Sequence, residues 1–496
     1  MWSTLFGILC VFSSCGLAVH AQGALADTVK RPPDKLRLSP DSVGRVLEVG
    51  RIVIVGNRLT RDHIIERELT LKTGDRVYSN ELPRILDLDK KKLVNTRLFN
   101  TVEVKPLGTN TNQIDLLVDL TERWYTFPSP IFEFSDRNFN EWWQNYNHDF
   151  RRVNYGLRLY QYNMRGRNET LRFTAQFGFV RKLDLSYRMP YIDKKRKQGL
   201  VVELDYQETK NLAFRTLEHK LDYRKSPDNL KTTKGIAVTY TYRNSFYRFH
   251  NIRLEYRDTR INDSVRIWNP NYLGEEGLHQ HFTSLSYSFT SDQRDYFAYP
   301  LRGHHFNFFM LKSGLGLGDN LNRFETGVSY SKFIPLKRKY FFSANVVGSL
   351  ATPDDLPYTN YNAMGFRKQF VRGYEVYVIE GPYFFLGKTT FKKLLLSRKY
   401  HWRIMPIEQF RHIPIQIYLK SYLDLGYVRN YPYYRTNPQS SYDQVHLNNN
   451  IFTDKLLSGA GGGIDIVGSY DMVLRFEYTW SADGQRGFFF HVKREF

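Results

Sequence analysis

Cysteine is almost absent from this chain of 496 residues, which has 2, Cys10 and Cys15. Both lie in an N-terminal segment with a short apolar centre and small residues near Ala21, the pattern of a secretory signal peptide. Lipidation of Cys15 is the alternative. Removal of residues 1–21 would leave a mature chain without cysteine, which excludes disulfides, a thiolate nucleophile and a cysteine-based metal site.

Long apolar runs are also missing. Beyond the N-terminal segment, no stretch is continuously apolar over the roughly 20 residues that a membrane-spanning helix requires. Aromatic residues nevertheless make up 16% of the chain, while the mean hydropathy is −0.50. A polar chain so rich in rings must alternate apolar with polar side chains, which excludes a bundle of membrane helices.

Negative charge is in short supply, because 71 lysine and arginine residues stand against 50 aspartate and glutamate residues, for a net charge of +21. This balance predicts anionic surroundings such as nucleic acid, lipid phosphates or lipopolysaccharide, or else a solvated basic surface. Basic clusters at 193–198 and 336–340 fall at predicted strand ends, where lipid headgroups would lie. Nucleic acid is a poor partner for an exported protein, so we expect none.

From about residue 153 to the end, apolar and polar residues alternate in short runs. In "GIAVTYTYRN", the residues on one face are Ile236, Val238, Tyr240 and Tyr242. Such alternation is typical of strands with one apolar and one polar face. So many of these strands on an exported chain predict a transmembrane β-barrel with lipid outside and water inside. A large secreted β-protein with one wet face is the alternative.

The barrel is predicted to have about sixteen antiparallel strands, an even number as in bacterial outer-membrane barrels. The long connections at 259–280, 350–381 and 424–457 follow odd-numbered strands and therefore share the extracellular side. The connection 394–412 is too long for a short periplasmic turn. The predicted strands are 153–163, 168–178, 181–190, 198–208, 215–225, 233–244, 247–259, 280–291, 303–312, 322–334, 340–350, 381–394, 412–424, 457–466, 470–480 and 486–496.

Residues 46–122 have a different pattern, which predicts a strand, two helices and two further strands. This β-α-α-β-β order, with the phrase "RLFNTVEV", resembles the POTRA domain, the periplasmic module of the BamA/TamA outer-membrane assembly superfamily. A generic small α+β domain is the alternative. The chain is therefore predicted to be mainly β. Its parts are a signal peptide at 1–21, a linker at 22–45, one small α+β POTRA domain at 46–122, a connecting segment at 123–152 and the barrel at 153–496.

Three motifs extend the resemblance into the barrel. The first, "DQRDYFAYPLRG", is similar to a signature that the superfamily carries across a periplasmic turn, here Asp292, Arg294, Asp295, Pro300 and Gly303. The second, "FVRGYE", is similar to the motif of its sixth loop, here Val371, Arg372, Gly373 and Tyr374. The third, "YLDLGYV", is similar to an element of a late strand, here Asp424 and Gly426.

The alternation in 412–424 predicts which acid Arg372 meets. Its apolar residues must face lipid, so Asp424 points into the lumen. A barrel of about sixteen strands accepts a folded loop. We therefore expect loop 350–381 to fold inward as a lid in which Arg372 pairs with Asp424, as the resemblance also implies. Arg372 as a solvated cation is the alternative. Because 381–400 contains no acid, the pair rests on Asp424 alone or adds Glu375 or Glu380.

The chain ends with alternating apolar residues on the predicted lipid face, Phe488, Phe490, Val492 and Phe496. This ending resembles the C-terminal signal by which bacterial barrels are recognised for insertion. Arg494 interrupts the alternation, and its long stem can reach the headgroup level.

Catalytic signatures are missing as well. The histidines have no metal-ligand spacing, and the glycine-rich "GAGGGID" at 459–465 lacks a following helix and is interpreted as a strand. We expect no enzyme activity and no cofactor. The resemblance implies a factor in the bacterial outer membrane, with its POTRA domain in the periplasm, that inserts or translocates proteins. The alternatives are a two-partner-type secretion channel for a dedicated exoprotein and a passive pore or structural barrel. Expected partners are unfolded outer-membrane or exported proteins, membrane lipids including lipopolysaccharide, and periplasmic or lipoprotein partners.

Overall fold

The computed structural model describes residues 45–108, 112–134, 148–193, 195, 197–245, 247–274, 277–365, 369–401, 412–436, 448–468 and 472–494. The predicted signal peptide and nearly all of the predicted linker lie outside these residues, as does Phe496. None of the described helices is both long enough and apolar enough to cross a membrane.

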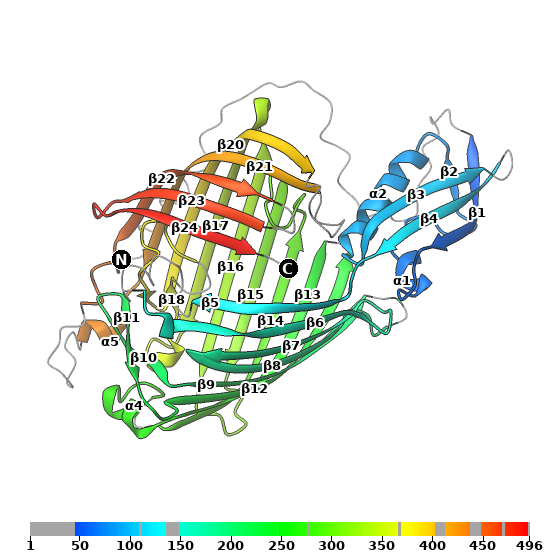
Figure 1. Cartoon of the computed structure of the whole chain (residues 1–496). Helices are drawn as coiled ribbons and strands as arrows, with labels where there is room; N and C mark the ends of the chain where they lie inside the picture. Colours follow the sequence, from blue (N-terminus) through cyan, green and yellow to red (C-terminus); the bar gives the residue numbers. More distant parts are fainter. Residues whose placement is uncertain are drawn as a thin grey trace, which may run out of the picture. The chain divides into compact units, whose positions relative to one another are not determined.

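The N-terminal module is a four-stranded sheet with two helices (Figure 1). The sheet order is β2-β1-β4-β3, with β1 parallel to β4 and the other pairs antiparallel. Ile65, Leu93 and Val118 are fully buried in its core. The predicted order lacked β2, because three residues are too few to show an alternating pattern. The elements are β1 (Val46–Val55), α1 (Asp62–Glu66), β2 (Arg76–Tyr78), α2 (Leu82–Asn95), β3 (Phe99–Gly108) and β4 (Gln113–Glu122).

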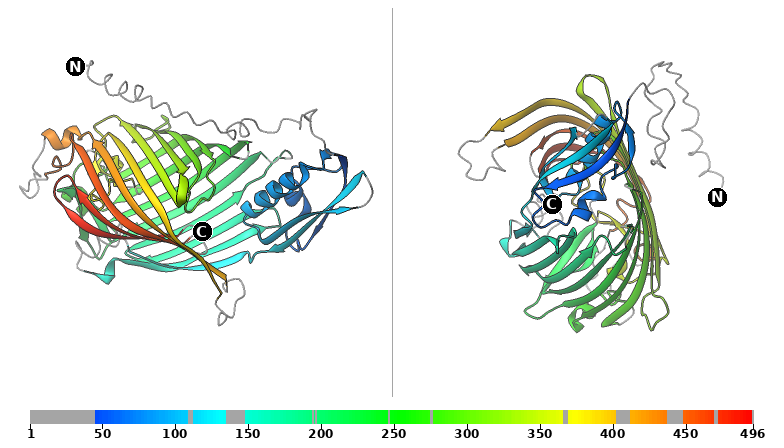
Figure 2. Two further views of the ribbon diagram at one scale, coloured as in Figure 1. Left: turned by 90° about the horizontal axis from the view of Figure 1, so that it is seen from above. Right: turned by 90° about the vertical axis from the view of Figure 1, so that its right-hand side faces the viewer.

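The described residues beyond this module are organised around a 16-stranded antiparallel sheet that curls round into a barrel (Figures 1 and 2). The predicted fold class is thereby confirmed. The strands, in sheet order, are β5 (Thr126–Phe134), β6 (Val153–Met164), β7 (Glu169–Gly178), β8 (Val180–Met189), β9 (Gln198–Thr209), β12 (Lys231–Ser245), β13 (Arg248–Ile261), β14 (His279–Asp292), β15 (Gly303–Ser313), β16 (Arg323–Pro335), β17 (Tyr340–Thr352), β20 (Tyr383–His401), β21 (His412–Val428), β22 (Leu456–Val467), β23 (Met472–Ser481) and β24 (Arg486–Arg494).

Two strand predictions were wrong, and the errors cancel in the count. The first barrel strand is β5, which lies in the segment predicted as a connection at 123–152; its prolines, Pro128 and Pro130, hid it. The predicted strand 215–225 is instead a turn with parts of two short strands, β10 (Asn211–Leu217) and β11 (Lys220–Lys225), which form a separate hairpin. The turn between the two short strands contains no glycine that would have predicted it. Glu218 and His219 instead adopt its positive φ angles of 50° and 59°.

The alternation of the barrel strands places apolar side chains outside and polar ones inside. On β21, Leu423 is 48% exposed on the outer face, whereas its neighbour Asp424 is 0% exposed in the lumen. Charged residues therefore face inward at the positions that the pleat requires.

The connections that follow four odd-numbered strands of the barrel lie at one end of it and pack on one another. Following the fifth, seventh, eleventh and thirteenth strands, they hold the hairpin β10–β11, α4 (Asp263–Trp268), β18 (Ala363–Met364) with β19 (Ile379–Glu380), and α5 (Pro432–Thr436). Val378 donates its N–H to the carbonyl of His219 at 2.7 Å, and the side chain of Asn449 donates to the carbonyl of Thr216 at 2.6 Å. We call the hairpin β10–β11 with residues 429–436 and 448–455 the cap.

Candidate functional site

The connection between β17 and β20, residues 353–382, enters the barrel, and we call it the lid. Its short strands β18 and β19 pair with each other, Ala363 opposite Glu380. Val371 and Tyr374 are buried in one cluster with Val428 and Leu457 of the barrel wall. The apolar contacts fix the lid along the last strands of the sheet, where its arginine meets the lumen-facing acids.

Arg372 forms a two-pronged ion pair with Asp424. Its Nε and Nη2 donate to the two carboxylate oxygens at 2.8 Å and 2.5 Å, and the backbone N–H of Arg372 donates to Oδ2 at 3.1 Å. The guanidinium carbon lies 3.7 Å from the ring centre of Tyr422. The planar fork of arginine suits this arrangement, because the two parallel hydrogen bonds and the ring contact each need a flat donor group.

Burial makes this ion pair sensitive to the loss of either partner. Arg372 is 8% exposed. Burial by itself lowers the pKa of Arg372, but the hydrogen bonds and charge of Asp424 outweigh it and raise the pKa above its usual value. An uncompensated charge at this depth would be strongly unfavourable, so each group requires the other.

Glycines give the lid tip the space that it occupies. A Cβ atom on Gly426 would lie 2.4 Å from Cγ2 of Val371, and one on Gly459 would lie 1.9 Å from the carbonyl oxygen of Arg372. Gly373 has a φ of 93° in the turn where Tyr374 donates its N–H to the carbonyl of Val371 at 3.0 Å. The predicted glycine-rich strand 459–465 thus has a specific use at its first position, which is close contact with the lid.

The second acid beside Arg372 is Glu477 of β23, which the sequence reasoning missed. Nη1 of Arg372 lies 3.4 Å from its Oε1. Glu375 instead lies 2.9 Å from Nε2 of His491 on β24. Glu380 lies away from the ion pair, where it accepts hydrogen bonds from Thr216 and Tyr434 of the cap. The only available signal was the lumen-facing position of Glu477 in the alternation of its strand.

A series of polar contacts runs from the lid to the predicted turn motif. Lys420 lies 2.8 Å from Glu477 and 2.5 Å from Asp465. Asp465 accepts a hydrogen bond of 2.8 Å from the hydroxyl of Tyr299, which lies in the turn between β14 and β15. The sixth-loop motif and the turn motif, 69 residues apart if counted from Gly303 to Arg372, are therefore connected through the lumen by three charged side chains.

The turn motif itself is built from local contacts. Nε of Arg294 donates to Asp292 at 2.7 Å, and Asp295 accepts the N–H of Leu301 at 3.0 Å. Gly303 has a φ of 105°, and a Cβ there would lie 2.0 Å from the carbonyl oxygen of Gln293. Pro300 follows Tyr299, so the motif shapes a turn that directs the Tyr299 ring into the barrel, 4.9 Å from that of Tyr418.

The predicted C-terminal signal is only partly covered by the described residues. Phe488 is 56% exposed on the outer face, and the ring of Phe490 lies 5.1 Å from that of Phe476. The side chain of Val492 and all of Phe496 lie outside the described part of the chain.

Among the described residues, one group has metal-ligand composition, Glu375, Glu477 and His491, with ligand atoms within 4.8 Å of one another. Lys420 and Arg372 already neutralise Glu477, at 2.8 Å and 3.4 Å. The group therefore fits an internal ion-pair network better than a cation site.

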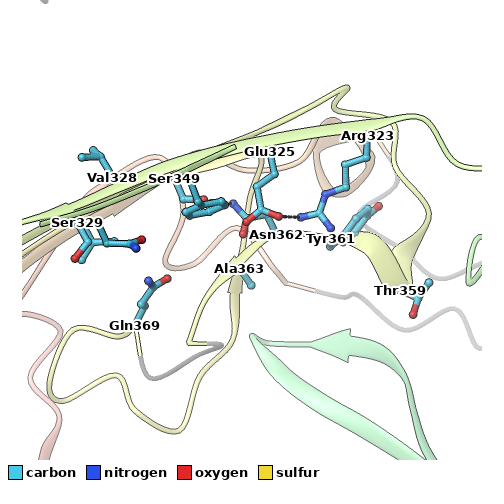
Figure 3. A pocket seen from close by; sticks show the side chains of 14 residues that line it. Arg323, Glu325, Val328, Ser329, Ser349, Thr359, Tyr361, Asn362, Ala363 and Gln369 are labelled. Atoms are coloured by element: carbon cyan, nitrogen blue, oxygen red, sulfur yellow. Dashed lines mark hydrogen bonds and ion pairs between the residues drawn. The ribbon is translucent and has the colours of Figure 1, made fainter. Parts of the chain in front are cut away.

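A polar cavity of about 260 Å³ separates part of the lid from β15, β16 and β17 (Figure 3). Asn362 and Gln369 line it from the lid. Arg323 and Glu325, 2.7 Å apart, line it from the barrel wall. The lid thus narrows the lumen without filling it.

Comparisons with known proteins identify the family. A model described as "Omp85 superfamily domain" matches residues 163–496, and one described as "Surface antigen variable number repeat", a POTRA model, matches residues 47–123. No curated protein matches the chain. BamA from Haemophilus ducreyi lacking POTRA domains 1-3 is similar in structure, with a TM-score of 0.54, 16% identity, and coverage of 90% of this chain and 84% of that chain. CdiB from Acinetobacter baumannii gives a TM-score of 0.49 and 13% identity, covering 90% and 73%.

The resemblance to the BamA/TamA superfamily is thereby confirmed. The family fold is a non-enzymatic barrel for the insertion or translocation of proteins, and with a POTRA domain it implies the bacterial outer membrane with that domain in the periplasm. The Omp85 superfamily model covers well over half of this chain's residues, and the chain therefore belongs to the Omp85 superfamily.

Proposed function

We propose that this protein is an outer-membrane assembly factor that inserts client barrel proteins at the junction of its first and last strands, β5 and β24, which we call the seam. The observation that carries the proposal is the composition of the two backbone edges that meet there. Among the described residues, no strand pairing joins β5 to β24. The direction of the backbone groups on each edge determines which hydrogen bonds the two strands can form with each other.

The edge of β5 at the seam lacks two of its N–H donors. Tyr162 of β6 donates its N–H to the carbonyl of Tyr125 at 2.7 Å, so odd-numbered residues of this segment point their backbone groups toward β6. Even-numbered residues therefore point toward the seam, and two of them are Pro128 and Pro130. Proline has no N–H, so this edge cannot form a continuous ladder.

The edge of β24 that faces the seam has a complete set of backbone N–H donors. Ser481 of β23 donates its N–H to the carbonyl of Gln485 at 2.9 Å, so the even-numbered residues of β24 point toward the seam. None of the even positions 486–494 is proline. An incoming strand can therefore add to β24 with every backbone group paired, while β5 offers it an interrupted partner.

The lid is placed to respond to events at β24. Glu375 of the lid lies 2.9 Å from His491 of β24, and the ring of Phe370 stacks near that of His491 at 6.2 Å. A displacement of β24 would disturb these contacts first. We infer that the Arg372–Asp424 ion pair keeps the lumen closed while the last strand engages a client.

Restoring the missing donors tests the proposal. The double variant Pro128→Ala/Pro130→Ala should pair β5 with β24 more firmly and slow the assembly of many outer-membrane barrels, measured by proteomics after depletion of the native protein. Pro335→Ala, at the end of β16, is the matched control and should have no effect. Loss of one exported protein alone would favour a dedicated secretion channel, and no change in either would favour a passive barrel. Lipid, lipopolysaccharide and lipoprotein partners remain predictions.

A further inference from the structure

β20 and β21 extend well beyond their neighbours in the sheet (Figure 2). The pairing of β17 with β20 stops at Lys393, and the pairing of β22 with β21 stops at Gln416. Residues 394–401 of β20 therefore pair with β21 alone. These residues and 412–415 form a two-stranded ribbon that accounts for the long connection near 394–412 noted in the sequence.

The ribbon lies at the end of the barrel where the POTRA domain joins it. β5 starts directly after that domain, and β20 is the twelfth strand of an antiparallel sheet, so β20 ends where β5 begins. On the neighbouring strands the same end carries the basic turn Lys337–Lys339. At about 3.3 Å per residue, eight residues carry the ribbon roughly 25 Å past this turn.

The ribbon cannot lie in the hydrocarbon core of the membrane. Both of its outer edges have unpaired backbone groups over the described residues 394–400 and 412–415, and hydrocarbon offers such groups no partner. Strand addition is also disfavoured, because a bulge between Leu394 and Leu396 and several cations protect the edges. The ribbon therefore lies outside the hydrocarbon core, at the boundary between the membrane and the periplasm or beyond it.

Side-chain direction separates the two faces of the ribbon. Lys393 pairs with Leu419, Leu396 with Ile417 and Arg398 with Ile415, and paired residues share a face. Leu419 is on the lipid-facing side of the barrel, so Lys393, Leu396 and Arg398 continue that side. Lys399 pairs with Pro414 and belongs to the opposite face.

Charge and composition identify the partner. The described ribbon has no acidic residue. Exposed cations lie at its base, Lys393, and along it, Arg398 and Lys399. Leu395 is 52% exposed and Tyr400 is 48% exposed. A basic strand with tyrosine and leucine, continuous with a lipid-facing surface, has the composition of the membrane–water interface.

We propose that the ribbon lies against the periplasmic leaflet and binds anionic phospholipid headgroups through Arg398 and through Lys393 at its base. This inference does not depend on the insertase function, because it follows from the length, charge and facing of the ribbon alone. Binding would anchor one side of the barrel to the leaflet from which periplasmic clients approach.

The test uses the full chain in nanodiscs, with Cys10 and Cys15 replaced by serine and Leu395→Cys labelled with a bimane. Quenching by a lipid that carries a nitroxide on its headgroup reports the distance between ribbon and leaflet. We expect quenching several-fold stronger with phosphatidylglycerol than with phosphatidylcholine alone. Each of Lys393→Gln and Arg398→Gln should weaken the phosphatidylglycerol-dependent association by about fivefold, while the folded barrel keeps its heat-dependent gel mobility.

Lys399→Gln is the matched control, since it removes the same charge from the opposite face, and it should leave quenching unchanged. Quenching that ignores phosphatidylglycerol, or that falls equally in all three variants, would overturn the proposal. A photocrosslinker at Tyr400 in growing cells provides the second measurement. A discrete protein adduct that disappears in Arg398→Gln would assign the ribbon to an acidic protein instead of to lipid.

Discussion

The carbonyl oxygen of Arg372 lies directly over Gly459, so close that a Cβ atom at position 459 would be 1.9 Å away. The lid and β22 are therefore fitted to each other at the backbone, independently of the Arg372–Asp424 ion pair. Both contacts involve Arg372: its carbonyl oxygen faces Gly459, and its side chain pairs with Asp424. Either can be altered by a single substitution, and the barrel strands that carry them have many other partners in the sheet.

Gly459→Ala should push the lid tip out of place while the barrel stays intact. Overpacking of this kind costs about 1–3 kcal/mol, and here the clashing atom is backbone, which cannot rotate away. Limited proteolysis of residues 353–382 should become faster in the variant. Gly462→Ala is the control, because the nearest atom to its Cβ is 3.4 Å away. Equal protease resistance of both variants would show that the lid does not depend on this contact.

Asp424→Asn should loosen Arg372, because breaking a buried ion pair costs about 3–5 kcal/mol. It would leave the guanidinium only the longer contact of 3.4 Å with Glu477. We expect an exposed lid, measured by protease sensitivity, and reduced assembly of outer-membrane barrels. Asp184→Asn is the control, since Asp184 also sits on a barrel strand and pairs with the half-exposed Lys182 at 2.9 Å. A lid as resistant as in the native protein would contradict a role for the pair.

Glu477→Gln should have an intermediate effect. Glu477 is 3.4 Å from Arg372 and 2.8 Å from Lys420, so it stabilises the lid through a longer contact than Asp424 does. In a double-mutant cycle, Glu477→Gln and Arg372→Ala should be non-additive by about 0.5–3 kcal/mol. Additive effects on lid protection would mean that Glu477 serves Lys420 and Asp465 alone.

The contact between lid and cap should weaken as the pH rises through neutrality. Glu380 is buried with the hydroxyls of Thr216 and Tyr434 and no described cation nearby, and burial raises its pKa to about 7. Because the pKa of Glu380 is raised in the closed state, Glu380 stabilises the contact between lid and cap fully below about pH 4.5. This stabilisation is lost as the pH rises through about 7. Glu380→Gln, which mimics the protonated group, should flatten this part of the pH profile of lid proteolysis. An unchanged profile would exclude Glu380 as its source.

His219 of the cap titrates in the opposite sense. Burial lowers its pKa to about 4, so its contribution is present above its ordinary pKa of 6.5 and is lost as pH falls toward 4. Subtracting the pH profile of lid proteolysis of Glu380→Gln from that of the native protein therefore separates the effect of Glu380 from that of His219.

The barrel could be predicted from sequence because lipid and lumen impose a period of two that few residues violate. The strand predictions failed where residues violate this period. Pro128 and Pro130 removed the strand signal from β5, and the turn at Glu218 and His219 had no glycine to divide two short strands. In both places tertiary pairing overrode the local pattern.

The lid pair could be predicted because Arg372 and Asp424 each stand in a recognisable motif and the pleat fixes the direction of Asp424. Glu477 lies 105 residues from Arg372 along the chain, in a strand with no such motif. Its partner depends on which lumen positions the closed sheet brings together, and that is a property of register across several strands. The close contact between Gly459 and the lid likewise depends on how register across several strands places β22 beside the lid.

The central claim is that the seam between β5 and β24 must open for clients to be inserted. Cysteine pairs between residues 126–132 and 486–490, in a chain with Cys10 and Cys15 replaced, would join the two strands covalently. A cysteine pair at Leu157 and Ala175, which are partners in β6 and β7, is the matched control. We predict that the seam disulfide stops barrel assembly, that reduction restores it, and that the control disulfide has no effect. Continued assembly by protein whose seam is fully crosslinked would contradict the account.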